Sequence, residues 1–277
     1  MSSGGVARSS IAALPNKRGP VESLIAGSNP ARSTTFTEAV GYDLPCEAED
    51  KYLSFCPSLE SRMKGVTGLS VALIAAAFLI SICVYSYLPE MVASHWNAMG
   101  EVDGYLPRFW GAFLVPLIMV GLYLLFLAIP RIDPLKENIM QFISYYYGFV
   151  VVMLLFMFII HNQVTLWNLG FAISPNIILP IGIGVLFIYV GLLLGKAKRN
   201  WFIGIRTPWT LSSDAVWAKT HRIGGRLFMF AGVISIVGVL LPDYAFLFIL
   251  LPVLVVAFYT IAYSYFAYQD EIKRAAE

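Results

Sequence analysis

Residues 109–130 read FWGAFLVPLIMVGLYLLFLAIP and contain no ionisable side chain. A helix needs about 20 such residues to cross the hydrocarbon core of a bilayer. Because lipid offers the backbone no hydrogen-bond partners, a segment of this kind crosses as an α-helix. The stretch therefore predicts a transmembrane helix and decides the fold class of the chain.

Comparable apolar runs occur through the rest of the chain. The 277 residues are 58% hydrophobic and only 13% charged, whereas a soluble domain carries about a quarter charged residues. We expect an all-α, polytopic helical membrane protein with about six transmembrane helices. The other five predicted spans are about 66–88, 142–161, 176–195, 223–241 and 244–268.

The charges between the spans predict the orientation. The segment 196–222 carries six lysines and arginines against one acid, whereas 89–108 carries three acids and one arginine. Cationic loops stay in the cytoplasm, so both termini are expected there, as an even number of spans requires. The predicted location is the cell membrane, as a multi-pass protein, with 89–108 outside.

Residues 1–62 are polar and lack helical periodicity. We expect either a disordered cytoplasmic tail or an extension created by a start codon placed too early. The second interpretation rests on the stretch AGSNPAR, residues 26–32, which resembles a translated transfer-RNA T-arm, and it makes Met63 the natural start. A native peptide upstream of Met63, found by N-terminal sequencing, would exclude it.

Familiar catalytic signatures are missing from the sequence. It has no HExxH zinc-protease motif, no Gly-x-Ser-x-Gly elbow and no phosphate-binding loop. The spans lack Asp, Glu and Lys, which disfavours a proton-coupled pump. We therefore predict a non-enzymatic protein without a cofactor. The alternative is a small-solute or lipid transporter, which would need polar groups converging in mid-membrane, where the chain offers Ser81, Ser144 and Ser235.

The predicted outer loop, 89–108, gathers turn residues and polar side chains. Its turn signals are NAMG, residues 97–100, and Asp103-Gly104. We expect either an external binding surface or a compact cap whose aromatic rings lie at the lipid headgroups. The spacing of its histidine and acids matches no standard ligand set, so no metal site is predicted. The candidate binding residues of this loop are His95, Trp96, Asn97, Gly100, Asp103 and Gly104.

The predicted cytoplasmic loop, 196–222, contains the stretch GIRTPWTLSSDAVWAKTHR, residues 204–222. Gly204 permits a tight backbone path. Ser212 is expected to cap a short amphipathic helix that lies on the inner leaflet against anionic lipid, before Gly224-Gly225 loosens the entry to the next span. The candidate residues of this cytoplasmic surface are Asn200, Gly204, Arg206, Thr207, Pro208, Trp209, Trp217 and His221.

Two stretches carry a family resemblance. Asn200 together with GIRTPWTLSSDAVWAKTHRIGG, residues 204–225, resembles the signature of the SdpI family of bacterial and archaeal membrane proteins. LPEMVASHWNAMGEVDGY, residues 88–105, resembles the short domain of unknown function that often precedes it. The resemblance divides the chain into residues 1–62, outside the family, a two-span domain over 63–131 and a four-span SdpI-like domain over 132–277.

The resemblance also implies a function. The best-known member of the family confers immunity to a secreted sporulation-delaying peptide toxin that acts on the membrane, and it signals by holding a transcriptional repressor at the membrane. We therefore expect immunity or signalling against a membrane-active peptide. The expected partners are membrane lipid, a peptide toxin outside and a transcriptional repressor inside, with no direct contact to nucleic acid.

Overall fold

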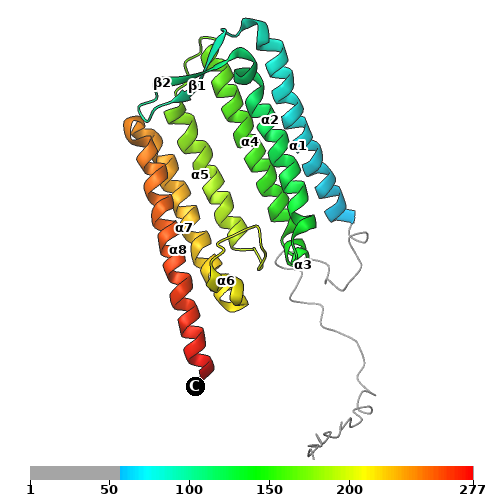
Figure 1. Cartoon of the computed structure of the whole chain (residues 1–277), viewed down its shortest axis with the longest axis vertical. Coiled ribbons are helices and arrows are strands. Elements are labelled where there is room, and N and C mark those ends of the chain that lie inside the picture. The colour runs from blue at the N-terminus through cyan, green and yellow to red at the C-terminus, as the bar shows by residue number, and fades with distance from the viewer. Residues whose placement is uncertain (1–56, 277) are drawn as a thin grey trace, which may run out of the picture. The chain divides into compact units, whose positions relative to one another are not determined.

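The computed structural model describes residues 57–276 (Figure 1). Residues 1–56, which include most of the predicted N-terminal tail, lie outside the described part of the chain. The first helix, α1, spans Pro57–Val84, so the boundary predicted at residue 62 falls inside a helix. The start at Met63 stays a prediction.

Six long apolar helices make up most of the described residues. Each is long and apolar enough to cross a membrane, which confirms the six predicted spans. Val255 and Phe258 are 66% and 69% exposed, a degree of apolar exposure suited to lipid contact. The helices after α1 are α2 Arg108–Ile132, α4 Ile143–Asn168, α5 Pro175–Leu194, α7 Asp214–Val237 and α8 Ala245–Ala276.

Short elements occupy the connections between the long helices. Helix α3 lies between α2 and α4, and helix α6 lies between α5 and α7. One short 3-10 helix follows α1, and two more join α7 to α8. Their bounds are α3 Lys136–Met140, α6 Pro208–Ser212, η1 Tyr85–Tyr87, η2 Gly238–Leu240 and η3 Pro242–Tyr244.

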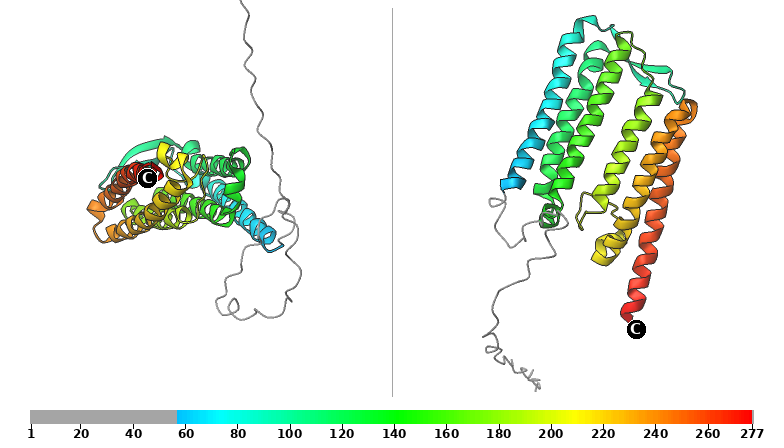
Figure 2. Two further views of the ribbon diagram at one scale, coloured as in Figure 1. Left: turned by 90° about the horizontal axis from the view of Figure 1, so that it is seen from below. Right: turned by 180° about the vertical axis from the view of Figure 1, so that it is seen from behind.

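The long helices form two groups (Figures 1 and 2). Helices α1, α2 and α4 pack together, α5, α7 and α8 pack together, and α4 contacts α5 between the groups. Helix α1 begins and α8 ends at the same end of the bundle, which also holds α3 and α6. We call it the loop end, and we call the opposite end, where the two strands lie, the hairpin end. The charge distribution predicts that the loop end is cytoplasmic.

Glycines bring α5 and α7 into backbone contact. A Cβ atom on Gly191 would lie 2.4 Å from the carbonyl oxygen of Gly225, and one on Gly225 would lie 2.6 Å from that of Gly191. Further along the two helices, a Cβ on Gly184 would lie 2.6 Å from the carbonyl oxygen of Gly232, and one on Gly232 would lie 2.5 Å from that of Gly184. Small residues allow this close approach in membranes, where van der Waals packing drives helix association.

The predicted outer loop forms a β-hairpin. Strand β1, Met91–Trp96, pairs antiparallel with β2, Val102–Pro107. The turn forms where the sequence predicts it, because Asn97 Oδ1 accepts a hydrogen bond from the backbone of Met99 at 2.9 Å and Gly100 has a φ of +82°. The strands were not predicted, since each has only six residues of mixed polarity.

The prediction of a separate amphipathic helix on the inner leaflet is wrong. Helix α7 runs without a break into the fifth span, and Ser213 rather than Ser212 caps it by accepting from the N–H of Val216 at 3.2 Å. Gly224 and Gly225 lie inside this helix, where Gly225 packs against α5. An unbroken helix keeps its backbone hydrogen-bonded in lipid, so these glycines serve packing.

Candidate functional site

Asn200 organises the connection between α5 and α7 at the loop end. Its side chain is fully buried. Nδ2 donates to the carbonyl oxygens of Lys198 and Ile203 at 2.8 and 2.9 Å, and Oδ1 accepts from the N–H groups of Phe202 and Ile203 at 3.0 and 2.6 Å. One amide therefore satisfies the backbone groups that regular secondary structure would otherwise pair.

The connection between α2 and α4 holds the same loop from the other group of helices. Asp133 is buried, and its carboxylate accepts from the N–H groups of Trp201 at 2.9 Å and Leu135 at 2.6 Å. Asn138 donates to the carbonyl oxygen of Arg199 at 2.7 Å. Sequence analysis missed both residues because their partners lie 68 and 61 positions away.

Gly204 brings the loop against two stacked rings of α7. Trp217 and His221 are buried, with ring centroids 3.9 Å apart. His221 Nε2 accepts from the N–H of Ile205 at 3.0 Å, so the proton of the neutral ring lies on Nδ1, 2.9 Å from the carbonyl oxygen of Trp217. Trp217 donates its indole N–H to the carbonyl oxygen of Ala197 at 2.9 Å. Helix α7 thus contacts the loop near both ends of the loop, at Ala197 and at Ile205.

We expect Gly204→Ala to destabilise the protein by about 2–3 kcal/mol, because a positive φ alone costs a non-glycine residue about 1–3 kcal/mol. Residue 204 has a φ of +120°, and a Cβ there would lie 2.3 Å from His221 Nε2. The thermal midpoint of detergent-purified protein, followed by tryptophan fluorescence, measures the loss. Gly195→Ala is the control, since its Cβ would meet no atom closer than 3.5 Å. Equal losses in the two variants would contradict this account.

A capping box fixes the short helix α6. Thr207 Oγ1 accepts from the N–H of Thr210 at 3.2 Å, and Thr210 Oγ1 accepts from the N–H of Thr207 at 2.9 Å. Thr207 also donates to Ser264 of α8 at 3.0 Å. Pro208 occupies the first turn, where a helix leaves its N–H groups unpaired. The segment from Arg206 to Trp209 is therefore an ordered turn docked on α8.

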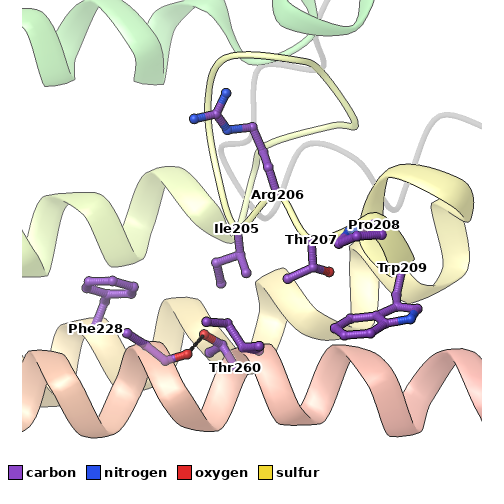
Figure 3. Close-up of a pocket in the computed structure, with 9 residues that line it drawn as sticks. Ile205, Arg206, Thr207, Pro208, Trp209, Phe228 and Thr260 are labelled. Carbon is purple, nitrogen blue, oxygen red and sulfur yellow. Dashed lines mark hydrogen bonds between the residues drawn. The ribbon is translucent and has the colours of Figure 1, made fainter.

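A groove lies between this turn and helices α7 and α8 (Figure 3). Its volume is about 450 Å³. Ile205 and Trp209 point toward α8, whereas the guanidinium of Arg206 turns away from α8 toward the loop, where it donates to the carbonyl oxygen of Trp201. The lining residues are Ile205, Arg206, Thr207, Pro208, Trp209, Phe228, Ala257, Thr260 and Ile261.

Polar contacts tie the start of α7 to its surroundings. Arg199 Nε lies 2.7 Å from a carboxylate oxygen of Asp214. Ser213 Oγ lies 2.9 and 2.7 Å from the two carboxylate oxygens of Glu271, near the end of α8. These contacts join the start of α7 to the α5–α7 connection on one side and to the last turns of α8 on the other.

The eight predicted residues of the cytoplasmic surface lie together but differ in exposure. Four are buried and hold the loop rather than form an exposed surface: Asn200, Thr207, Trp217 and His221. Gly204 is half-buried against the rings of α7. Arg206 and Pro208 are exposed, and Trp209 is half-buried beside them. The exposed residues of this predicted set therefore lie in the Arg206–Trp209 turn.

At the hairpin end, two asparagines join the β-hairpin to both groups of helices. Asn168, the last residue of α4, accepts from the N–H of Ala93 at 2.8 Å and donates to its carbonyl oxygen at 3.0 Å. Asn176, in the first turn of α5, donates to the carbonyl oxygens of Ala98 at 3.1 Å and Pro242 at 3.0 Å. Since Pro242 lies between α7 and α8, the hairpin bridges the two groups.

The predicted residues of the outer loop occupy the hairpin and its turn. His95 Nδ1 lies 2.5 Å from an Asp103 carboxylate oxygen, and both side chains are exposed. Trp96 packs edge-on against Trp167 of α4, with ring centroids 5.5 Å apart. Gly104 pairs with His95 across the strands, where a Cβ would lie 2.9 Å from His95 Cβ. Among residues 57–276, no group of three or more His, Cys, Asp or Glu could hold a metal ion.

The three serines that could have formed a mid-membrane polar site lie on different helices. Ser81 of α1 donates to the carbonyl oxygen of Ala112 at 2.7 Å and lies 3.2 Å from His161 Nε2. Ser235 of α7 donates to a carbonyl oxygen of α5 at 3.1 Å. Ser144 of α4 is exposed. The three hydroxyls have separate surroundings, so they do not build the convergent site that a transporter would need.

Comparison with known proteins agrees with this architecture. Residues 196–264 match the SdpI/YfhL protein family, and residues 72–120 match DUF1648, a domain of unknown function. The chain is 26% identical over 202 residues to Immunity protein SdpI of Bacillus subtilis (strain 168), and the matched region is 73% of this chain and 95% of that protein. No solved structure matches the chain.

Each of the two family matches includes one of the two connections described above. The match over 72–120 contains the hairpin and the helix ends that carry it, and the match over 196–264 contains the Asn200 loop, helix α7 and the groove. Six helices of the described chain are long and apolar enough to span a membrane. The chain is therefore a multi-pass membrane protein whose residues 196–264 match the SdpI/YfhL family.

Proposed function

We propose that the protein acts in immunity or signalling against a membrane-active peptide, without enzymatic activity and without a cofactor. Its similarity to an immunity protein extends over 95% of that protein's length. The single observation that carries the proposal is the bridging of both groups of helices by the hairpin, through Asn168 and Asn176. A ligand bound to the hairpin could therefore change the positions of both groups of helices.

The charge of the hairpin region suits a basic amphipathic peptide. Residues 89–107 include Glu90, Glu101 and Asp103 and no lysine or arginine, and clustered charge of one sign attracts ligands of the other. Tyr105 and Met99 are 56% and 66% exposed beside these acids, so apolar contact is available as well. The peptide would bind here from the outer side of the membrane.

Contacts at the loop end would transmit the effect of peptide binding to the cytoplasmic side. Asp133 and Asn138 belong to one group of helices, and their partners Trp201 and Arg199 belong to the connection of the other group. A change in the relative position of the groups would therefore move the α5–α7 connection. A cytoplasmic regulator, such as a transcriptional repressor, would read the exposed Arg206–Trp209 turn, and the membrane protein itself would not contact nucleic acid.

A toxin challenge tests the proposal. The chain is expressed in Bacillus subtilis cells that lack their own SdpI, and the cells are exposed to graded doses of the sporulation-delaying peptide. We expect survival at doses that kill cells with an empty vector. Equal survival, with the protein shown to be present in the membrane fraction, would contradict the proposal.

We expect Asn176→Ala to lower the highest toxin dose that cells survive by about thirtyfold, because it removes two hydrogen bonds worth about 1 kcal/mol each. Its amide joins the hairpin tip at Ala98 to Pro242 between α7 and α8. Membrane abundance should stay within about twofold, since Asn176 is only half-buried and contributes little to the packing of the bundle. Met99→Ala is the control, because its exposed side chain lies at the same tip. Full protection by the Asn176 variant would argue against the bridging role.

A further inference from the structure

The groove beside the Arg206–Trp209 turn has an apolar interior (Figure 3). Thr207 donates its hydroxyl to Ser264 at 3.0 Å, and Thr260 donates its hydroxyl to the carbonyl oxygen of Val256 at 2.8 Å. Both hydroxyls therefore already have hydrogen-bond partners. Phe228, a ring of α7, forms another part of the lining. The interior offers no free donor that would hold a water molecule there.

The two ends of the groove differ in polarity along the direction of the helices. Phe228 and Ala257 lie inside the fifth and sixth spans. Arg206, Pro208 and Trp209 belong to the connection that the charge distribution places at the cytoplasmic surface, and Figure 3 shows Trp209 at the opposite end of the groove from Phe228. This change from apolar to cationic and aromatic groups matches the change from hydrocarbon to headgroup in the inner leaflet.

The groove opens beside side chains that face the bilayer. Ile261 lines the groove and is 47% exposed, and Phe258 next to it on α8 is 69% exposed. An apolar depression at this depth loses van der Waals contact unless a neighbouring molecule fills it. The molecule that surrounds a membrane helix at this depth is a lipid, so an acyl chain is the occupant of matching shape and chemistry.

We propose that this groove holds an acyl chain of an anionic phospholipid of the inner leaflet, with the lipid phosphate beside Arg206. Arg206 is the one charged residue of the lining. Its guanidinium donates one hydrogen bond to Trp201, and a guanidinium has five N–H donors, so donors are left for a phosphate. The side chain is exposed, and that one bond holds its guanidinium on the loop side of the groove, away from α8. This inference does not rest on the proposed function.

Quenching of Trp209 by brominated lipids tests the site in proteoliposomes of the full chain. The Trp209 signal is the difference between the unmodified protein and Trp209→Phe. We expect phosphatidylglycerol with brominated chains to quench this signal at about one fifth of the mole fraction that brominated phosphatidylcholine needs, the preference expected for one cation at an anionic surface. Equal quenching by the two lipids would overturn the proposal.

Matched variants separate the headgroup from the chain. Arg206→Gln should bring the ratio between the two lipids close to one, whereas Arg222→Gln, at another exposed cation of the same region, should leave it unchanged. Ala257→Phe should reduce quenching by both lipids, because the ring would occupy the groove. Size-exclusion profiles and thermal midpoints identify the folded variants. A preference that persists in Arg206→Gln, or full quenching in folded Ala257→Phe, would place the lipid elsewhere and overturn the inference.

Discussion

Gly191→Leu is expected to remove most of the folded protein from the membrane. Overpacking costs about 1–3 kcal/mol and occasionally more, and this site falls at the upper end because the opposing atom is a backbone oxygen that cannot rotate away. Its first added carbon would already lie 2.4 Å from the carbonyl oxygen of Gly225 and 2.6 Å from Met229 Cγ. At about 3 kcal/mol the ratio of folded to misfolded protein falls by roughly a hundredfold.

Fluorescence-detected size-exclusion chromatography of detergent extracts measures the folded fraction. Gly121→Leu is the matched control, since Gly121 lies within the α2 span and an added Cβ would meet nothing within 4 Å. We expect the control to elute as a single folded species at unchanged abundance. Elution of Gly191→Leu in the same way would contradict a backbone contact between α5 and α7 at this glycine.

Asn200→Ala is expected to loosen the α5–α7 connection and to lower the free energy of unfolding by about 3 kcal/mol. Each buried polar group left without a partner costs about 1–3 kcal/mol, and the loop relaxes to recover part of the total. The substitution removes the partners of two N–H groups and two carbonyl oxygens around residues 198–203. The loop should then open to protease at temperatures where the bundle stays folded.

Limited trypsin digestion measures this opening, because the connection contains lysines and arginines at 196, 198, 199 and 206. Cleavage within it should become at least about tenfold faster, in line with the lost stability. Asn162→Ala is the control, since that amide donates only to Phe158 of its own helix. Asn200→Asp should be intermediate, because it keeps the acceptor oxygen and loses the donors. An unchanged cleavage rate in Asn200→Ala would show that other contacts hold the loop.

The spans and their order could be predicted because they depend on local composition. A run such as 109–130 has no alternative in lipid other than a helix, and the structure has a helix at each of the six predicted places. The turn at Asn97 and Gly100 was also predictable, since both residues carry their turn chemistry in their own side chains or backbones. The capping role was assigned to the neighbouring serine, because Ser212 and Ser213 are equally suited and only the folded geometry distinguishes them.

The candidate sites were harder to predict because their key contacts are distant in sequence. Asp133 sits 68 positions from Trp201, and Asn168 sits 75 positions from Ala93, so no local pattern marks either residue. Continuity of α7 through Gly224 and Gly225 also depends on a neighbour, since Gly225 packs against the backbone of α5. In isolation, two adjacent glycines favour a break in a helix. Tertiary packing reversed that preference.

The paired glycines limit how the protein can change shape. Gly184 meets Gly232 and Gly191 meets Gly225, so a shift of α5 by a single residue relative to α7 would lift both contacts and set side chains against carbonyl oxygens. These contacts therefore oppose sliding of α5 along α7. A displacement of the two groups of helices relative to each other would therefore carry α5 and α7 together and change the contact of α4 with α5.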